Sequence, residues 1–387
     1  MDDKALQIGE TRVVAPGDFQ VLLDELSRRG YTTLGPTVSE GVIAYAPLKK
    51  TEQLPIGWSD YQDAGCYRLV ERKDRALFGY VVGPHSWKKF TFPSSVELLR
   101  FRRDNGKTQV IASKDKAPKY AFIGVRPCEL QALRIHDDVL IKSRYSDSDY
   151  AARRKHNFIV TVNCFEPAGT CFCTSMNTGP VATEGFDLGI TEVCTPQAHF
   201  LLIETGSGRG AEVLSAVPGQ PATDQQRNMA RDILEAARKR IRRTMQLSEV
   251  KDLLHRQVES NHWEEVGKRC LSCTNCTMVC PTCFCTSIED STDLAGTEAT
   301  RTRKWDSCFN EDYSYIHGGS VRTSPGARYR QWITHKLATW QDQFGQPGCV
   351  GCGRCITWCP VGIDITEEIA ALQSKEKPSQ QPVGVEE

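Results

Sequence analysis

CLSCTNCTMVCP, residues 270–281, and CVGCGRCITWCP, residues 349–360, decide the fold of the C-terminal third of this chain. Both stretches read C-x2-C-x2-C-x3-C-P. Three cysteines at every third position of a tight loop can reach three corners of an iron–sulfur cubane, and the fourth cysteine of such a run binds the cluster of the other run. The spacing therefore predicts two [4Fe–4S] clusters. Their expected ligands are Cys270, Cys273, Cys276 and Cys359 for the first, and Cys349, Cys352, Cys355 and Cys280 for the second.

Zinc binding and disulfide bonding are the alternatives to cluster ligation for these cysteines. Zinc sites usually present paired C-x2-C hooks with longer gaps, not two complete runs of four cysteines and a proline. Disulfide frameworks are typical of small secreted domains. This chain has 387 residues, an odd number of cysteines, 17, and an N-terminal stretch, MDDKALQIGE, unlike a secretory signal. The pattern therefore favours clusters over both alternatives.

Charge and hydropathy exclude two broad classes of protein. Lys plus Arg and Asp plus Glu number 48 each, so the chain lacks the basic excess with which nucleic-acid binders neutralise phosphates. No apolar run approaches the roughly 20 residues that span a bilayer. We therefore expect a soluble, cytoplasmic protein.

The rest of the chain predicts an α+β, multi-domain protein. Residues 325–344 have a helical pattern that stops at Gly345, and a further helix is expected from near Asp364. These features indicate an α-helical ferredoxin-like domain and not the small kind that contains a β-sheet. The expected domains are a weakly structured lead-in (1–55), an α/β domain with a partly parallel sheet (56–222), a helical linker (223–260), the helical two-cluster domain (261–373) and a disordered tail (374–387).

Four short runs in the N-terminal half have the composition of strands, at residues 78–83, 120–125, 158–162 and 200–205. A helical pattern at 129–139 separates the second run from the third. Parallel neighbours need such a crossover connection, so the second and third strands are expected to be a parallel pair.

A third cluster is predicted at the ends of these two strands. Cys128 and Cys164 directly follow them, and open α/β sheets place their ligands at the carboxyl edge. Cys171 and Cys173 follow on a loop that contains Gly and Pro. The four residues Cys128, Cys164, Cys171 and Cys173 then match the ligand count of a further [4Fe–4S] cluster. The alternative is four unrelated buried thiols.

The hexapeptide TCFCTS occurs twice, at 170–175 and 282–287. In the second copy, Cys283 and Cys285 either shield a neighbouring cluster or join another site. Cys66, Cys194 and Cys308 stand alone and are interpreted as structural thiols. No Ser-His-Asp or paired-carboxylate arrangement is present, so the sequence does not predict bond chemistry by this chain alone.

Several motifs together resemble one known family. They are FIGVRPCEL (122–130), VNCFEPAGTCFCTSMNTGP (162–180), CPTCFCTSIEDSTDL (280–294), CVGCGRCITWCPVGIDI (349–365) and GYVVGPHSWKKFTFP (79–93). They are similar to the beta subunit of cytoplasmic, sulfhydrogenase-type [NiFe] hydrogenases. The likeness runs from roughly residue 55 to residue 370.

The resemblance implies a heterotetrameric oxidoreductase complex in which this subunit performs electron transport. A flavoprotein subunit would bind NAD(P), and hydrogenase small and large subunits would hold further clusters and the nickel–iron site. The eight cysteines of the two runs match the family motif position for position, and the likeness extends to the four N-terminal cysteines. The electron-transfer subunit of anaerobic siroheme sulfite reductases belongs to the same broader family and is the alternative, and a scaffold with structural zinc is a third hypothesis.

Overall fold

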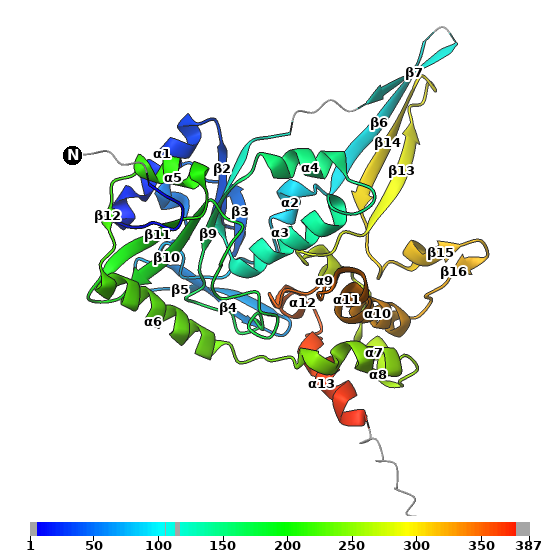
Figure 1. The fold of residues 1–387 in the computed structure, drawn as a ribbon. Helices are drawn as coiled ribbons and strands as arrows, with labels where there is room; N and C mark the ends of the chain where they lie inside the picture. The colour runs from blue at the N-terminus through cyan, green and yellow to red at the C-terminus, as the bar shows by residue number, and fades with distance from the viewer. Residues whose placement is uncertain (1–5, 105, 113–116, 377–387) are drawn as a thin grey trace, which may run out of the picture.

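The computed structural model describes residues 6–104, 106–112 and 117–376. An eight-stranded sheet forms the N-terminal part, a group of short helices forms the C-terminal part, and a long four-stranded ribbon projects from the junction between them (Figure 1). The fold is therefore mixed in helix and strand, as predicted. Of the helices within the described ranges, none is both long and apolar enough to cross a membrane.

The large sheet is mixed, with parallel pairs at its centre. In spatial order its strands are β12 (Gln220–Pro221), β1 (Thr11–Val14), β11 (His199–Thr205), β10 (Leu188–Cys194), β9 (Phe158–Val162), β8 (Tyr120–Val125), β2 (Thr32–Ser39) and β3 (Val42–Pro47). β8 pairs in parallel with both β9 and β2. The predicted parallel pair of residues 120–125 and 158–162 is confirmed, and the crossover between them is helix α3 (Pro127–Leu140).

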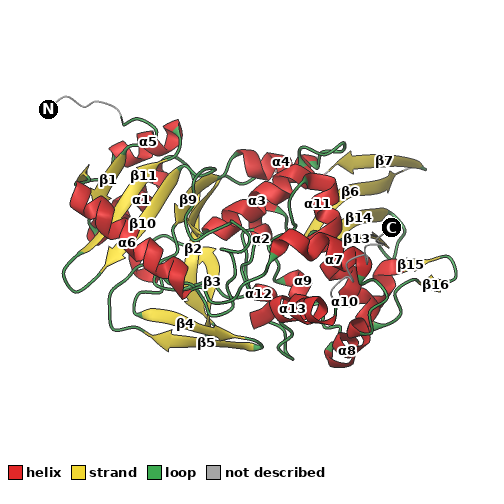
Figure 2. Ribbon diagram, turned by 60° about the horizontal axis from the view of Figure 1, so that its bottom comes forward, coloured by secondary structure: helices red, strands yellow, loops and turns green. Residues whose placement is uncertain are grey.

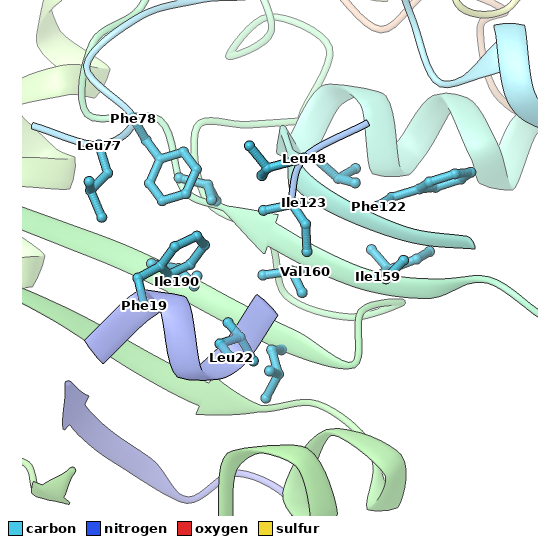
Figure 3. Close-up of a cluster of buried hydrophobic side chains, with 14 of the residues drawn as sticks. Phe19, Leu22, Leu48, Leu77, Phe78, Phe122, Ile123, Ile159, Val160 and Ile190 are labelled. Carbon is cyan, nitrogen blue, oxygen red and sulfur yellow. The ribbon is translucent and has the colours of Figure 1, made fainter. Parts of the chain in front are cut away.

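The strands are central because their side chains are apolar on both faces. All five residues of β9 are buried, which is typical of strands covered by helices on both sides. On one face, Phe19 and Leu22 of α1 (Phe19–Arg28) pack against the sheet near Ile123, Val160 and Ile190 (Figure 3). Packing in this core holds the C-terminal ends of β8 and β9 in place.

The described part of the predicted lead-in (1–55), residues 6–55, is not weakly structured as the sequence predicts. Strands β1 to β3 and helix α1 lie in this stretch and complete both sides of the large sheet. The prediction failed because β2 and β3 contain Gly35, Pro36 and Pro47, which are depleted in strands. Pairing with the buried strand β8 overrides that local signal.

The C-terminal part is not purely helical either. Between the two cysteine runs, β13 (Thr286–Thr292) and β14 (Glu298–Trp305) form a hairpin that pairs with β6 (Ser95–Asp104) and β7 (Lys107–Ala112). One sheet thus joins strands from both sides of the predicted boundary near residue 261. Two smaller hairpins are β4 (Trp58–Asp63) with β5 (Cys66–Glu71), and β15 (Tyr315–Ile316) with β16 (Gly319–Ser320).

The predicted C-terminal helices are present. The stretch 325–344 forms α10 (Pro325–Thr334), a π-helical segment (His335–Thr339) and α11 (Trp340–Phe344), and it stops at Gly345 with φ +71°. Asp364 caps α13. The remaining helices are α2 (Lys88–Thr91), α4 (Ser148–Lys155), α5 (Gly208–Ser215), α6 (Asp224–Arg240), α7 (Val250–Arg256), α8 (His262–Arg269), α9 (Asn275–Met278), α12 (Arg354–Thr357) and α13 (Ile365–Lys375). The predicted tail lies, from residue 377 on, outside the described residues.

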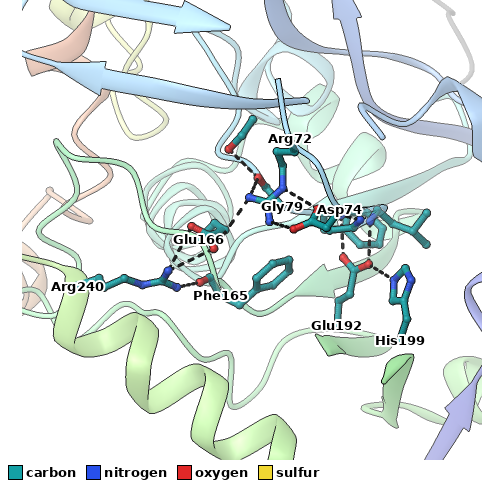
Figure 4. A network of polar contacts seen from close by, with 12 residues as sticks. Arg72, Asp74, Gly79, Phe165, Glu166, Glu192, His199 and Arg240 are labelled. Carbon is teal, nitrogen blue, oxygen red and sulfur yellow. Dashed lines mark hydrogen bonds and ion pairs between the residues drawn. The ribbon is translucent and has the colours of Figure 1, made fainter. Parts of the chain in front are cut away.

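Residues 78–83 are a buried loop and not the predicted strand. The N–H groups of Leu77 and Phe78 donate to the two carboxylate oxygens of Glu192 at 2.7 and 2.8 Å, and His199 contacts the same carboxylate (Figure 4). A side chain therefore satisfies backbone groups that a strand would pair with a neighbouring strand. This carboxylate holds the loop beside the sheet.

The two halves are joined by a buried ion pair. Arg354 of α12 donates to Glu129 of α3 at 2.7 Å, and the two side chains are 3 % and 1 % exposed. The hydroxyl of Tyr45 donates to the other oxygen of Glu129 at 2.6 Å. Hairpin β4–β5 also reaches the C-terminal helices (Figure 2), where the N–H of Gly65 donates to the carbonyl of Ile356 at 3.1 Å.

We expect E129Q to lower the free energy of unfolding by about 3–5 kcal/mol, because it leaves the Arg354 charge buried without a counter-ion. Denaturant unfolding followed by far-UV circular dichroism under anaerobic conditions measures this. The matched control is D290N, which breaks the exposed pair of Asp290 with Arg301 and should change stability far less. Equal effects of the two variants would contradict a structural role for the buried pair.

Candidate iron–sulfur site

The two cysteine runs fold into equivalent loops. Each run has positive φ at its third and fifth residues: Ser272 (+52°) and Thr274 (+67°) in the first, Gly351 (+65°) and Gly353 (+74°) in the second. One short helical turn follows in each, α9 in the first run and α12 in the second, and these turns contact each other. The shared motif therefore produces one local conformation twice.

The same backbone-to-sulfur hydrogen bond occurs in both loops. The N–H of Ser272 donates to Cys270 Sγ at 3.4 Å, and the N–H of Gly351 donates to Cys349 Sγ at 3.4 Å. Such bonds stabilise thiolate sulfur, and hydrogen bonds to cluster sulfurs are one of the means by which proteins set potentials. In both loops the backbone conformation thus directs an N–H group at the sulfur of the first cysteine.

The thiols of the first predicted set line one hollow. We call this set the outer set: Cys270, Cys273, Cys276 and Cys359. The hollow has a volume of about 470 Å³ when the open space at its mouth is included. Its wall also contains Cys355 and apolar side chains that include Phe309, Tyr329 and Trp332. Cys273 is exposed and the other three thiols are partly buried, so the outer set reaches the surface through Cys273.

The thiols of the second predicted set, which we call the inner set, are Cys280, Cys349, Cys352 and Cys355. Burial raises the pKa of the Cys355 thiol well above its usual range, and the neighbouring thiols Cys349, Cys352 and Cys280 raise it further. The structure therefore brings Cys280 of the first run to the three cysteines of the second. Only 8 % of Cys280 is exposed.

The four N-terminal cysteines, which we call the sheet-edge set, also come together. Cys128 lies in the first turn of α3 and Cys164 two residues after β9, at the same edge of the sheet. Burial raises the pKa of Cys128 well above its usual range, and Cys352, Cys173 and Cys164 contribute as neighbours. The sheet-edge set therefore lies beside the inner set, through Cys352.

A buried cation without a carboxylate partner accompanies the sheet-edge set. Arg126 is 2 % exposed and donates through Nη2 to the carbonyls of Phe78 and Tyr80 at 2.9 and 2.6 Å. Its Nε and Nη1 have no hydrogen-bond partner among the described residues. Burial raises the pKa of Cys164, and the guanidinium of Arg126 opposes that shift. An uncompensated buried charge is costly, so this environment fits an anionic group held by the four thiols.

Two glycines allow the sheet-edge loop to contact the second run through its backbone. A Cβ on Gly351 would lie 2.7 Å from Cys173 N, and one on Gly353 would lie 2.3 Å from Thr170 O. The N–H of Phe172 donates to the carbonyl of Gly351 at 2.9 Å. The equivalent positions of the first run hold Ser272 and Thr274, which line an open surface hollow. The contact therefore explains why the second run needs glycine.

The thiol geometry does not fit mononuclear sites. Across residues 6–104, 106–112 and 117–376, no three His, Cys, Asp or Glu side chains converge closely enough to hold a single metal ion. Thiols around one zinc ion lie about 2.3 Å from the metal, whereas thiols at the corners of a cubane are spaced more widely. The described thiols are therefore not arranged as a mononuclear zinc site.

The other five cysteines fall outside the three sets. Cys283 lies beside Cys280, whose pKa its hydrogen bond lowers. The thiols of Cys285 and Cys308 contact each other, while Cys66 and Cys194 lie on β5 and β10. The structure thus puts Cys283 against an inner-set thiol, one of the two roles that the sequence left open.

Sequence reasoning missed two buried cations beside the thiols: Arg126, near Cys164, and Lys336, whose Nζ lies 3.4 Å from Cys280 Sγ. Arg126 could have been suspected because it directly precedes Pro127 and Cys128 at a strand end. Lys336 gives no such signal, because it stands in an ordinary helical pattern.

Comparison with known proteins bears on the two cysteine runs. Residues 269–363, which contain both cysteine runs, match the family described as "4Fe-4S dicluster domain". The chain is 31 % identical over 257 residues to sulfhydrogenase 2 subunit beta of Pyrococcus furiosus, an alignment that covers 66 % of this chain and 74 % of that relative.

We expect G353A to loosen the contact between the sheet-edge loop and the second run. The new Cβ would meet Thr170 O, and alanine at φ +74° costs on the order of 1–3 kcal/mol. A lower midpoint of thermal unfolding and a lower iron content per chain would follow. T274A is the matched control, since it changes the equivalent position of the first run without adding an atom. If G353A melts and binds iron like T274A, the close contact does not matter for assembly.

Proposed function

The chain belongs to the family of sulfhydrogenase beta subunits, and from that premise we propose that it relays electrons within a [NiFe] hydrogenase complex. It is an iron–sulfur electron-transfer subunit. Its electrons would pass between the hydrogenase catalytic module and a flavoprotein subunit that binds NAD(P), or an external acceptor. The observation that carries the proposal is the convergence of twelve cysteines into three adjacent sets.

The ligand assignment follows the three sets. The outer set would hold one [4Fe–4S] cluster, the inner set a second and the sheet-edge set a third. Crossing of the fourth cysteines, Cys280 and Cys359, ties the two runs into one unit. When bound, each cluster supplies reversible one-electron chemistry. The role of the chain is to hold the three positions in fixed order, to exclude water and to compensate charge.

The proposed order of the relay is sheet-edge, inner, outer. Cys352 of the inner set is a neighbour of the sheet-edge thiols, and Cys276 of the outer set is a neighbour of Cys280 and Cys355. These contacts support a relay in which the inner set lies between the sheet-edge set and the outer set.

Burial supports the outer set as the end that faces a partner subunit. Cys171 and Cys173 of the sheet-edge set are 8 % and 6 % exposed. Beside the outer set, in contrast, Leu271 is 63 % and Val361 is 41 % exposed. Apolar side chains at an exposed cluster suit contact with another protein. We propose that this complex is soluble and cytoplasmic.

The third cluster is tested by C164S. Wild-type chain should contain about twelve iron atoms and as much sulfide, and C164S about eight, because one of three four-iron clusters loses a ligand. Metal analysis of purified protein measures this. C194S is the matched control, since Cys194 lies outside the three sets, and it should keep the wild-type iron content. About eight iron atoms in the wild type would mean that the sheet-edge thiols hold no cluster.

The relay is tested by C276S in the complex that contains this chain. We expect NAD(P)-linked hydrogen turnover to fall sharply, because an outer-set ligand is lost, while hydrogen oxidation with an artificial dye remains. C194S should preserve both activities. Equal loss of the two activities in C276S would contradict the relay role. Siroheme in place of nickel in the purified complex would instead favour a sulfite reductase.

A further inference from the structure

Lys336 is a buried cation aimed at a thiol of the inner set. The residue lies in the π-helical segment and is 5 % exposed. Its Nζ donates to Cys280 Sγ at 3.4 Å, to Thr282 Oγ1 at 2.9 Å and to the carbonyl of Gly348 at 3.0 Å. All three ammonium donors are thus directed to the chain segments that flank the inner set.

This ammonium has no carboxylate partner. Among the described residues, no Asp or Glu oxygen lies within ion-pair distance of Lys336 Nζ. A buried ammonium is costly unless an anion compensates it, and the atoms around Nζ offer one such anion, the sulfur of Cys280. The charge of Lys336 therefore acts on the inner set and is not neutralised elsewhere.

The outer set lacks an equivalent group. Its fourth ligand, Cys359, occupies the position in its run that Cys280 occupies in the other, yet in the part of the chain that the structure describes no lysine or arginine donates to its sulfur. Arg269 is the cation near Cys359. It is 47 % exposed and paired with Glu368 at 2.6 Å, so its field at the outer set is largely cancelled.

Arg354, the arginine beside the inner set, has a carboxylate partner. Arg354 lies near Cys352, but Glu129 binds it at 2.7 Å. Lys88 is a second buried lysine in this region, and its Nζ donates to the carbonyls of Cys283 and Met278 at 3.0 and 3.4 Å. Among the described residues, Lys336 is therefore the buried cation that donates to an inner-set sulfur and has no carboxylate partner.

We propose that Lys336 tunes the relay by raising the reduction potential of the inner cluster above that of the outer cluster. Reduction adds a negative charge to the cluster, and both a nearby positive charge and a hydrogen bond to a ligand sulfur stabilise the reduced state. An electron that enters at the outer set is then drawn inward. This inference rests on the proposed function, since it requires both clusters.

The experiment is a redox titration of the purified complex followed by electron paramagnetic resonance. C276S removes an outer-set ligand and C164S removes a sheet-edge ligand, so the signal that persists in both variants is that of the inner cluster. K336M should decrease the ratio of reduced to oxidised inner cluster at a fixed potential by at least tenfold, which corresponds to about 59 mV for one electron. The outer signal should stay in place.

K88M is the matched control, because it removes a buried lysine that does not contact a ligand sulfur. It should shift the inner signal much less than K336M. An inner potential that is unchanged in K336M at wild-type iron content would overturn the inference and leave the proposed relay standing. Absence of [4Fe–4S] signals from the wild type would instead overturn the proposed function.

If K336M fails to bind iron, T282V provides a second test of the role of Lys336. The Thr282 hydroxyl lies 3.2 Å from Cys280 Sγ and accepts from Lys336 Nζ, so it holds the ammonium in place without carrying charge. We expect a smaller shift of the inner signal in the same direction as in K336M. A T282V protein with full iron content and an unshifted inner signal would overturn the role of Lys336.

Discussion

The close approach of two backbone segments, 170–173 and 351–353, is the constraint on which the arrangement of the three thiol sets depends. It brings Cys173 and Thr170 against Gly351 and Gly353, where no side chain larger than hydrogen fits. At the equivalent place in the first run, Ser272 instead accepts a hydrogen bond from Arg328 at 3.2 Å. Two runs with one motif and one local conformation therefore meet different surroundings. The second run is the more buried of the two, whereas Leu271, Cys273 and Asn275 of the first run are exposed.

The buried cations near the thiols also differ in their surroundings. Buried ions cost several kcal/mol each unless they are compensated, and this chain buries Arg126, Lys336 and Arg354 near its thiols. Arg354 has Glu129 as its counter-ion. Arg126 and Lys336 have no carboxylate partner among the described residues, so their stability depends on the anionic sulfur beside them. Metal binding and folding are linked in such sites, and the two cations strengthen that link here.

Sequence reasoning identified what local patterns encode. The two cysteine runs, the helix that ends at Gly345 and the parallel strands β8 and β9 each carry a periodicity or spacing within a few residues. The placement of Cys128 and Cys164 at one sheet edge followed from the strand pair alone. Grouping of the thiols into three sets is therefore largely a consequence of short-range signals.

The failures are pairings that no local signal encodes. β6 and β14 lie about 200 residues apart in the chain and pair across a predicted domain boundary. Many of their residues are charged, and none is fully buried. Residues 78–83 have the composition of a strand, but the Glu192 carboxylate satisfies the N–H groups of Leu77 and Phe78. Lys336 was missed for a related reason. Its role depends on what lies opposite it in space, and a lysine in a helical pattern is usually a solvated residue.

The 68 residues between Cys280 and Cys349, residues 281–348, give the two similar loops different surroundings. Their hairpin β13–β14 anchors this part to β6 of the N-terminal half, and their π-helical segment supplies Lys336. Segments of π-helix are frequent at functional sites. A compact two-cluster protein without such an insertion has little means of burying a cation beside one cluster and not the other. The insertion can thus make the two clusters differ in potential, although the two runs share one sequence motif.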